Sequence, residues 1–108
     1  MITRIWHGKT KTADAAVYRD FVIATGMKEY AEASGNKGAQ IWQRIEGDIT
    51  HIWTVSWWDR LESIKAFAGD NIEKAKYYDD DKKYLLEFEP KVIHCETFDF
   101  SPITQSQL

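Results

Sequence analysis

The 108-residue sequence has one cysteine, Cys95, so the chain cannot form an internal disulfide. A lone thiol fits a reducing compartment. The N-terminus lacks the apolar core of a secretory signal, and no run of apolar residues reaches the roughly 18 that a membrane-spanning helix needs. We therefore expect a cytoplasmic protein without a membrane partner.

Positive charge is not in excess either. The chain has 14 Lys and Arg residues against 17 Asp and Glu residues, which gives a formal net charge of −3. Proteins that bind the phosphates of nucleic acids usually carry a clustered basic patch. Here the basic residues are scattered among the acidic ones, so we expect a solvated surface and no nucleic-acid partner.

Motifs of metal, nucleotide and serine-nucleophile sites are also missing. The three histidines, His7, His51 and His94, are far apart, and no HxH, HExxH or CxxC spacing occurs. There is no GxGxxG loop, P-loop or Gly-x-Ser-x-Gly elbow. The sequence thus predicts neither a metal nor a bound cofactor, and Cys95 is expected to be a buried, inert thiol.

What the sequence does contain is an alternation of β-branched, aromatic runs with amphipathic segments. Strands are predicted at 2–8, 39–45, 49–57 and 91–98, and helical segments at 12–33, 59–68, 70–77 and 79–89. The glycine-containing connector 46–48 predicts a hairpin. This β-α-β-β-α-β order is the ferredoxin-like plan, an α+β fold. We expect one domain over residues 1–100 and a loose polar tail over 101–108.

Alternation along the strands sorts their residues into two faces. The odd-numbered positions, which include His7, Trp53 and Trp57, are the more apolar set and are expected to be covered by helices. The even-numbered positions form a semi-polar face that contains Arg4, Trp6, Trp42, Arg44, Ile52, Val92, His94, Glu96 and Phe98. Large apolar patches usually mark interfaces. The even face is therefore predicted to form a homodimer, and a monomer with surface aromatics is the alternative.

The chain resembles antibiotic-biosynthesis-monooxygenase-like proteins in six stretches, which are RIWHG, SGNKGA, EGDIT, SWWDRLESIKAFAG, KAKYYDDD and LEFEPKVIHCETF. The resemblance spans roughly residues 2–98. It implies a dimeric α+β barrel. Because proteins of this type include cofactor-free monooxygenases, haem-degrading enzymes and isomerases, the resemblance is specific for the fold and weak for the activity.

The haem-degrading branch of this family can be compared residue by residue. Its pattern has an asparagine near the end of the first strand, a tryptophan on the helix after the third strand and a haem-ligating histidine ten residues later. The corresponding positions here are His7, Phe67 and Tyr77, and all three differ. Tyrosine ligates haem iron in other proteins, so Tyr77 or Tyr78 keeps haem binding as a less favoured alternative.

The candidate site is a pocket between the odd face and the helices. Together with the resemblance, aromatic walls and a histidine base favour cofactor-independent oxygenation of a small aromatic or polyketide-like molecule. His7 is the expected proton acceptor and Tyr77 the expected hydrogen-bond donor. The expected walls are Phe21, Trp53, Trp57 and Phe67.

Two further interpretations of this pocket stay open. His7 can be a core histidine whose hydrogen bonds are satisfied, and Trp53 and Trp57 can be ordinary core residues. A non-catalytic homodimer that binds a small hydrophobic molecule, such as a stress or regulatory module, needs the same pocket but no base. Whether His7 faces an open cavity separates these interpretations.

Overall fold

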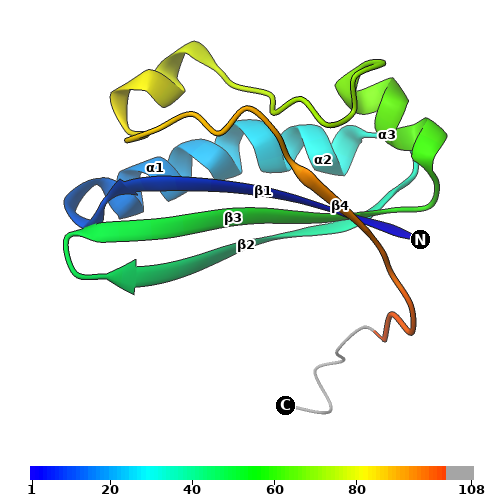
Figure 1. The fold of residues 1–108 in the computed structure, drawn as a ribbon, viewed down its shortest axis with the longest axis horizontal. Coiled ribbons are helices and arrows are strands. Elements are labelled where there is room, and N and C mark those ends of the chain that lie inside the picture. The colour runs from blue at the N-terminus through cyan, green and yellow to red at the C-terminus, as the bar shows by residue number, and fades with distance from the viewer. Residues whose placement is uncertain (102–108) are drawn as a thin grey trace.

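The structure, a computed structural model, describes residues 1–101 and has the predicted α+β architecture (Figure 1). Its antiparallel sheet has the strand order β2-β3-β1-β4. The strands are β1 (Ile2–Lys11), β2 (Asn36–Glu46), β3 (Ile49–Trp58) and β4 (Ile93–Glu96). Helices α1 (Ala15–Val22), α2 (Lys28–Glu32) and α3 (Leu61–Ala68) lie on one side of the sheet (Figure 1). The ferredoxin-like β-α-β-β-α-β order is confirmed.

The first helical stretch forms one rod across the sheet. It begins with a 3-10 turn, η1 (Thr12–Asp14), and α1 continues into α2 through a π-helical turn, η2 (Ile23–Met27). Single π-helical turns inside helices often occur at functional sites. This turn contains Thr25 and Gly26, and both lie against the cavity described below.

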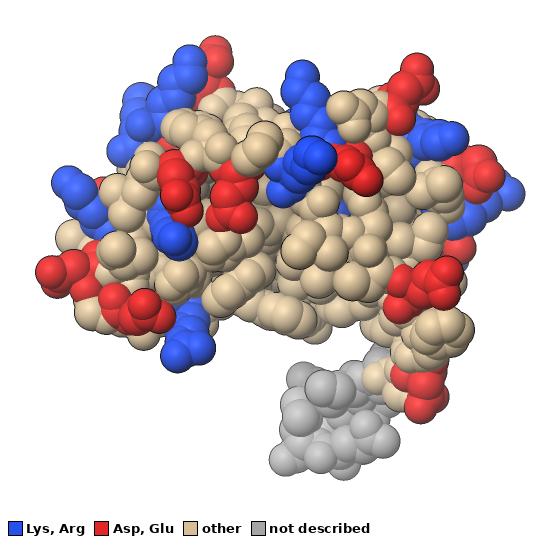
Figure 2. Space-filling model, in the orientation of Figure 1, with Lys and Arg blue, Asp and Glu red and all other residues tan. Residues whose placement is uncertain are grey.

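The described residues include no helix that could span a membrane. Charged side chains of both signs are interspersed over the side of the molecule shown in Figure 2. That distribution agrees with the small net charge of −3. Of the predicted tail over 101–108, all but Ser101 lies outside the described residues.

The chain between α3 and β4 contains less helix than predicted. Residues 70–77 are irregular, and the predicted helix over 79–89 is reduced to the 3-10 helix η3 (Asp79–Lys83). Because β4 pairs only with Ile2–Ile5, the rest of that edge of β1 is free for another partner. The backbone N–H of Leu86 donates to the carbonyl of Lys9 at 2.9 Å. Backbone N–H and C=O groups of this segment therefore find hydrogen-bond partners at the sheet edge instead of within a helix.

The two faces of the sheet are the reverse of the prediction in β1, β3 and β4. The even-numbered residues Trp6, Ile52 and Trp58 are buried in clusters with helix residues. Directly paired residues of antiparallel strands share a face. The side of the sheet away from the helices, which we call the open face, carries no helix (Figure 1). The open face comprises Thr3, Ile5, His7, Gln40, Trp42, Arg44, His51, Trp53, Val55, Trp57, Ile93 and Cys95. Only in β2 is the predicted assignment right.

Hydroxyl side chains explain why alternation misled the prediction. Thr54 and Ser56 face the helices and give the even positions of the third predicted strand a polar pattern, yet both are buried, as is Thr10 beyond the predicted end of the first strand. Thr10 donates from Oγ1 to the carbonyl of Tyr84 at 2.9 Å, and the hydroxyls of Tyr30 and Thr54 are 3.2 Å apart. Because these hydroxyls find protein partners, their burial carries no penalty for an unpaired polar group.

Candidate functional site

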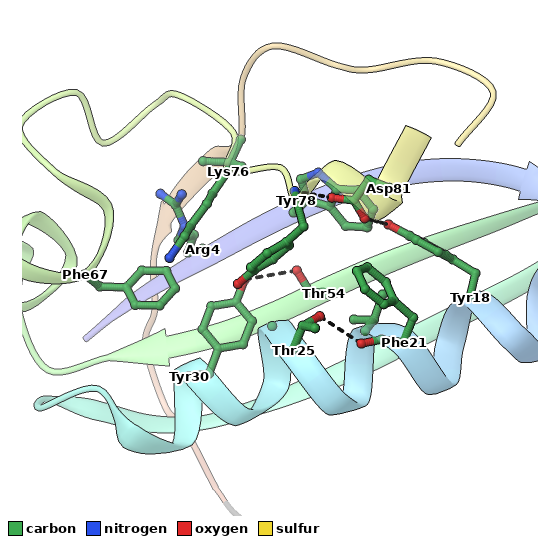
Figure 3. A pocket seen from close by; sticks show the side chains of 14 residues that line it. Arg4, Tyr18, Phe21, Thr25, Tyr30, Thr54, Phe67, Lys76, Tyr78 and Asp81 are labelled. Atoms are coloured by element: carbon green, nitrogen blue, oxygen red, sulfur yellow. Dashed lines mark hydrogen bonds between the residues drawn. The ribbon is translucent and has the colours of Figure 1, made fainter. Parts of the chain in front are cut away.

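A cavity lies between the helix-covered face of the sheet and the α1–α2 rod (Figure 3). It is lined by Arg4, Trp6, Tyr18, Phe21, Val22, Thr25, Gly26, Tyr30, Thr54, Phe67, Lys76, Tyr78, Asp81 and Val92. Its volume is about 60 Å³. A dry cavity of about 150 Å³ accommodates benzene. The side chains that line this cavity must therefore move before an aromatic ring can enter.

Arg4 supplies a buried positive charge to the cavity. Its side chain comes from β1, and the residue is only 3% exposed. Nη1 donates to the carbonyl of Ile72 at 2.6 Å and lies 3.0 Å from Nε2 of His94, and Nη2 lies 3.5 Å from the carbonyl of Lys74. Burial lowers the pKa of Arg4, and the neighbouring Tyr30 partly opposes this effect. Within residues 1–101, no carboxylate lies within ion-pair distance of the guanidinium.

Asp81 supplies a buried carboxyl group to the same cavity. It lies on η3 and is 4% exposed. The hydroxyl of Tyr18 donates to Oδ1 at 2.9 Å, and the backbone N–H of Tyr78 donates to Oδ2 at 2.6 Å. Burial raises the pKa of Asp81, although both hydrogen bonds oppose this shift. The pKa of Tyr18 is also raised, by burial first and by the Asp81 charge second, so Tyr18 stays protonated as the donor.

Lys76 is the exposed member of the cavity lining. Its ammonium nitrogen lies 2.7 Å from the carboxylate of Glu29 on α2 and 5.1 Å from the ring centre of Phe67. The same nitrogen lies 5.9 Å from the ring centre of Tyr78. Lys76 belongs to the irregular stretch that follows α3. Its ion pair with Glu29 therefore links this stretch to α2 on one side of the cavity.

The structure brings together only part of the predicted site. Phe21 and Phe67 line the cavity, as expected for two of the predicted walls. His7, Trp53 and Trp57 lie on the open face, on the other side of the sheet. The expectation that they share a pocket with the helix residues is wrong, because the odd positions of β1 and β3 point away from the helices. Their proposed roles in catalysis and binding stay predictions.

Tyr77 is placed next to the cavity and is not among the residues that line it. Its hydroxyl donates to the carbonyl of Glu89 at 2.5 Å and accepts from Nε1 of Trp6 at 3.4 Å. Both hydrogen-bonding directions of the hydroxyl are thus used within the protein. Burial raises the pKa of Tyr77, which favours the protonated donor.

His7 belongs to a histidine pair on the open face. Its Nδ1 contacts the carboxylate of Glu89, and its Nε2 lies 2.9 Å from Nδ1 of His51. The two imidazoles stack with ring centres 5.2 Å apart, and Trp53 lies against both rings. Nε2 of His51 lies 3.7 Å from the carboxylate of Glu46. His7 is therefore a hydrogen-bonded histidine outside the helix-side cavity.

Sequence reasoning missed Arg4 and Asp81 as cavity residues. Arg4 carries a signal that could have found it, because a charged residue beside Ile5 and Trp6 in an apolar strand needs a special environment. Asp81 carries no such signal, since the adjacent Asp79 and Asp80 are identical in type and exposed. Only the course of η3 distinguishes the buried carboxyl group from its two neighbours.

Cys95 is exposed, and the expectation that it is buried is wrong. The reason is its position on the open face of the short edge strand β4. Among residues 1–101, no group of three or more His, Cys, Asp or Glu side chains is arranged to hold a metal ion.

Comparison with known proteins supports the fold. No family model matches this sequence, and no curated protein matches it. An uncharacterised NIPSNAP domain protein from Burkholderia xenovorans matches with a TM-score of 0.57 at 12% identity, over 95% of this chain and 100% of that chain. The structure of Rv0793 from Mycobacterium tuberculosis matches with a TM-score of 0.55 at 8% identity, over 94% of this chain and 100% of that chain. At such identities, the similarity shows a shared ferredoxin-like α+β fold and no shared activity.

Proposed function

We propose that the chain is an antibiotic-biosynthesis-monooxygenase-like protein that oxygenates a small, enolisable aromatic molecule in the helix-side cavity without a bound cofactor. The observation that carries this proposal is Asp81, a buried carboxyl group with a raised pKa that faces aromatic walls. A raised pKa makes a carboxylate a stronger base, which suits proton abstraction from carbon near neutral pH. Asp81 therefore takes the role of base that the sequence assigns to His7.

The proposed reaction converts a methylene carbon to a carbonyl. The Asp81 carboxylate takes a proton from the substrate CH₂, and the electron pair of the broken C–H bond delocalises over the substrate as an enolate. The enolate reduces dioxygen by one electron, and the two radicals combine to a peroxide at the same carbon. Asp81 returns its proton to the peroxide. The remaining C–H bond at that carbon and the O–O bond then break together, so that the electron pair of the C–H bond forms the C=O bond and the released proton and hydroxide combine to water. The balance is CH₂ + O₂ → C=O + H₂O.

Tyr18 and the backbone of Tyr78 position the base. Each oxygen of Asp81 accepts one hydrogen bond from these donors, and a carboxylate oxygen has a second lone pair for the substrate proton. The aromatic walls Phe21 and Phe67 exclude water from the carbanion. Tyr18 thus fixes the orientation of the carboxylate while the cavity keeps it poorly solvated.

Oxygen uptake with anthrone, an enolisable ketone that dioxygen converts to anthraquinone and water, tests the proposal. We expect the unmodified protein to accelerate uptake above the rate without protein. Asp81→Asn should lower that enzymatic increment about 10²- to 10⁴-fold, the usual contribution of a general base, and His7→Gln should retain it. An increment that survives Asp81→Asn and disappears in His7→Gln would return the role of base to His7. No acceleration by the unmodified protein contradicts catalysis on this substrate.

A non-catalytic binding protein is the second candidate, and the satisfied carboxyl group of Asp81 favours it. Both oxygens of Asp81 already accept hydrogen bonds, and the cavity of about 60 Å³ is small. This candidate predicts that aromatic ligands bind the cavity while oxygen uptake stays at the rate without protein.

We also propose that two copies associate through their open faces, in place of the even face predicted from the sequence. Trp42 and Ile93 are 47% and 62% exposed on this face, and packing against a second sheet would remove such apolar area from water. Light scattering after size-exclusion chromatography should give the mass of a dimer. Ile93→Lys should shift it toward a monomer, whereas Ile23→Lys on η2, where the native side chain is 52% exposed, should not. A monomeric unmodified protein at micromolar concentration would contradict the dimer.

A further inference from the structure

The cavity contains two buried groups of opposite charge that do not pair with each other. Arg4 and Asp81 are 3% and 4% exposed, and no ion pair joins them within residues 1–101. In Figure 3, Arg4 lies on the side of Lys76 and Phe67, whereas Asp81 lies on the side of Tyr18. Buried charges in proteins are usually paired. Each end of the cavity therefore lacks a counter-charge.

The Arg4 end is the one that can accept an ion. The groups around its guanidinium are the carbonyls of Ile72 and Lys74, Nε2 of His94 and the hydroxyl of Tyr30, and none of them is a carboxylate. Burial and the Arg4 charge lower the pKa of His94, so its imidazole stays neutral beside the guanidinium. The 3.5 Å contact to Lys74 is at the limit of a hydrogen bond, which leaves Nη2 available to a ligand. A second basic side chain, Lys76, lies on the same cavity, with its ammonium paired to Glu29.

We propose that the Arg4 end of the cavity binds the carboxylate of a small, planar aromatic monocarboxylate. This inference rests on the proposed function insofar as the cavity is a small-molecule site, and it names the ligand class. Arginine binds carboxylates through paired N–H groups in one plane. The ring of Phe67 lies on the Arg4 side of the cavity in Figure 3, and the ring of Trp6 also lines the cavity. Such aromatic walls suit a flat ligand.

The Asp81 carboxylate restricts the ligand to one negative charge. The Asp81 carboxylate occupies the far end of the cavity and repels a second anionic group there. The volume of about 60 Å³ means that any aromatic ring must widen the cavity as it enters. A carboxylate directly attached to a single ring requires the least widening.

Titrations with benzoate and its neutral isostere benzamide test the proposal. The chain has five tryptophans, and their indole N–H signals in ¹H–¹⁵N spectra report on both sides of the sheet. We expect benzoate to shift the Trp6 signal and leave the open-face Trp42 signal in place. Benzoate should bind about tenfold or more tightly than benzamide. In Arg4→Met the ratio of the benzoate affinity to the benzamide affinity should fall to about one. In Arg44→Met, on the open face, this ratio should be unchanged.

The outcomes separate this inference from the proposed function. Equal affinities of benzoate and benzamide at the Trp6 side would overturn the carboxylate site and leave the small-molecule cavity intact. Binding of neither ligand up to millimolar concentration would contradict both the carboxylate site and the small-molecule cavity. If Arg4→Met does not fold, the ratio of the benzoate and benzamide affinities in the unmodified protein still tests the carboxylate site. Lys76→Met, at an exposed position, should then lower the affinity for benzoate and leave that for benzamide unchanged.

Discussion

Both faces of the sheet mix polar and apolar side chains, but their environments differ. The helix-covered face carries Arg4, Thr10 and Thr54, which are polar and buried, whereas the open face carries Trp42 and Ile93, which are apolar and exposed. What covers a strand thus determines burial more than the pattern along the strand does. Polar side chains buried on the helix-covered face hold hydrogen-bonding groups at fixed positions, as a binding site requires. An apolar and exposed face is suited to association.

Replacing one tryptophan on each face should give the largest contrast. Trp58 is fully buried between the sheet and the helices, whereas Trp42 on the open face is 47% exposed. Trp58→Ala should lower the free energy of unfolding by about 3–5 kcal/mol, because it leaves a large cavity in the core. Trp42→Ala should change the free energy of unfolding of the monomer by about 0.5 kcal/mol or less.

Urea denaturation at several protein concentrations measures both tryptophan variants and separates monomer stability from association. A Trp42→Ala effect as large as that of Trp58→Ala, at a concentration where the chain is monomeric, would contradict the assignment of the two faces.

A smaller contrast comes from the polar residues of the same two faces. Thr10 is fully buried, and its hydroxyl donates to the carbonyl of Tyr84. Thr10→Val removes this donor with little change in shape and should lower the free energy of unfolding by about 1–3 kcal/mol. Gln40→Val on the open face should be nearly neutral, since its contact with Nε1 of Trp42 is exposed to solvent. Chemical denaturation checks both, and a neutral Thr10→Val would show that this buried hydroxyl contributes nothing to stability.

The order of elements could be predicted from the sequence because it depends on local signals. The hairpin is one example, since Gly47 takes a φ of 62° in the turn between β2 and β3, a conformation that favours glycine. Strand alternation, in contrast, yields two sets of residues without stating which set the helices cover. The hydroxyls of Thr54 and Ser56 made the buried set look solvated. Their partners become known only when the helices are placed.

The candidate site was harder to predict than the fold because its contacts are distant in sequence. The hydrogen bond between Tyr18 and Asp81 joins residues 63 positions apart. The contact between Arg4 and His94 joins residues 90 positions apart. Neither contact has a spacing motif, so no local pattern indicates it. Phe21 and Phe67 could be predicted as walls because each lies on the apolar stripe of a helix.

The smallest expected effect is a pH dependence of stability from His94 on the helix-covered side. Burial, and next the charge of Arg4, lowers the pKa of His94 below its usual 6.5, while Glu73 partly opposes this shift. The folded state therefore binds fewer protons than the unfolded state as the pH falls below about 6.5. The stabilising contribution of neutral His94 is present above that pH. It is lost as the pH falls from 6.5 toward the lowered pKa of the folded state.

His94→Gln removes the titrating ring and keeps an oxygen that can accept from Arg4. The difference in free energy of unfolding between the unmodified protein and His94→Gln isolates this residue from the other groups that titrate in the same range. As the pH is lowered from 7.5 to 5, the free energy of unfolding of the unmodified protein should fall relative to that of His94→Gln. Urea denaturation at each pH measures this difference. Asp81 has the opposite sign, because its raised pKa makes the folded state bind more protons. Parallel curves for the two proteins would mean that Arg4 does not hold His94 in its neutral form.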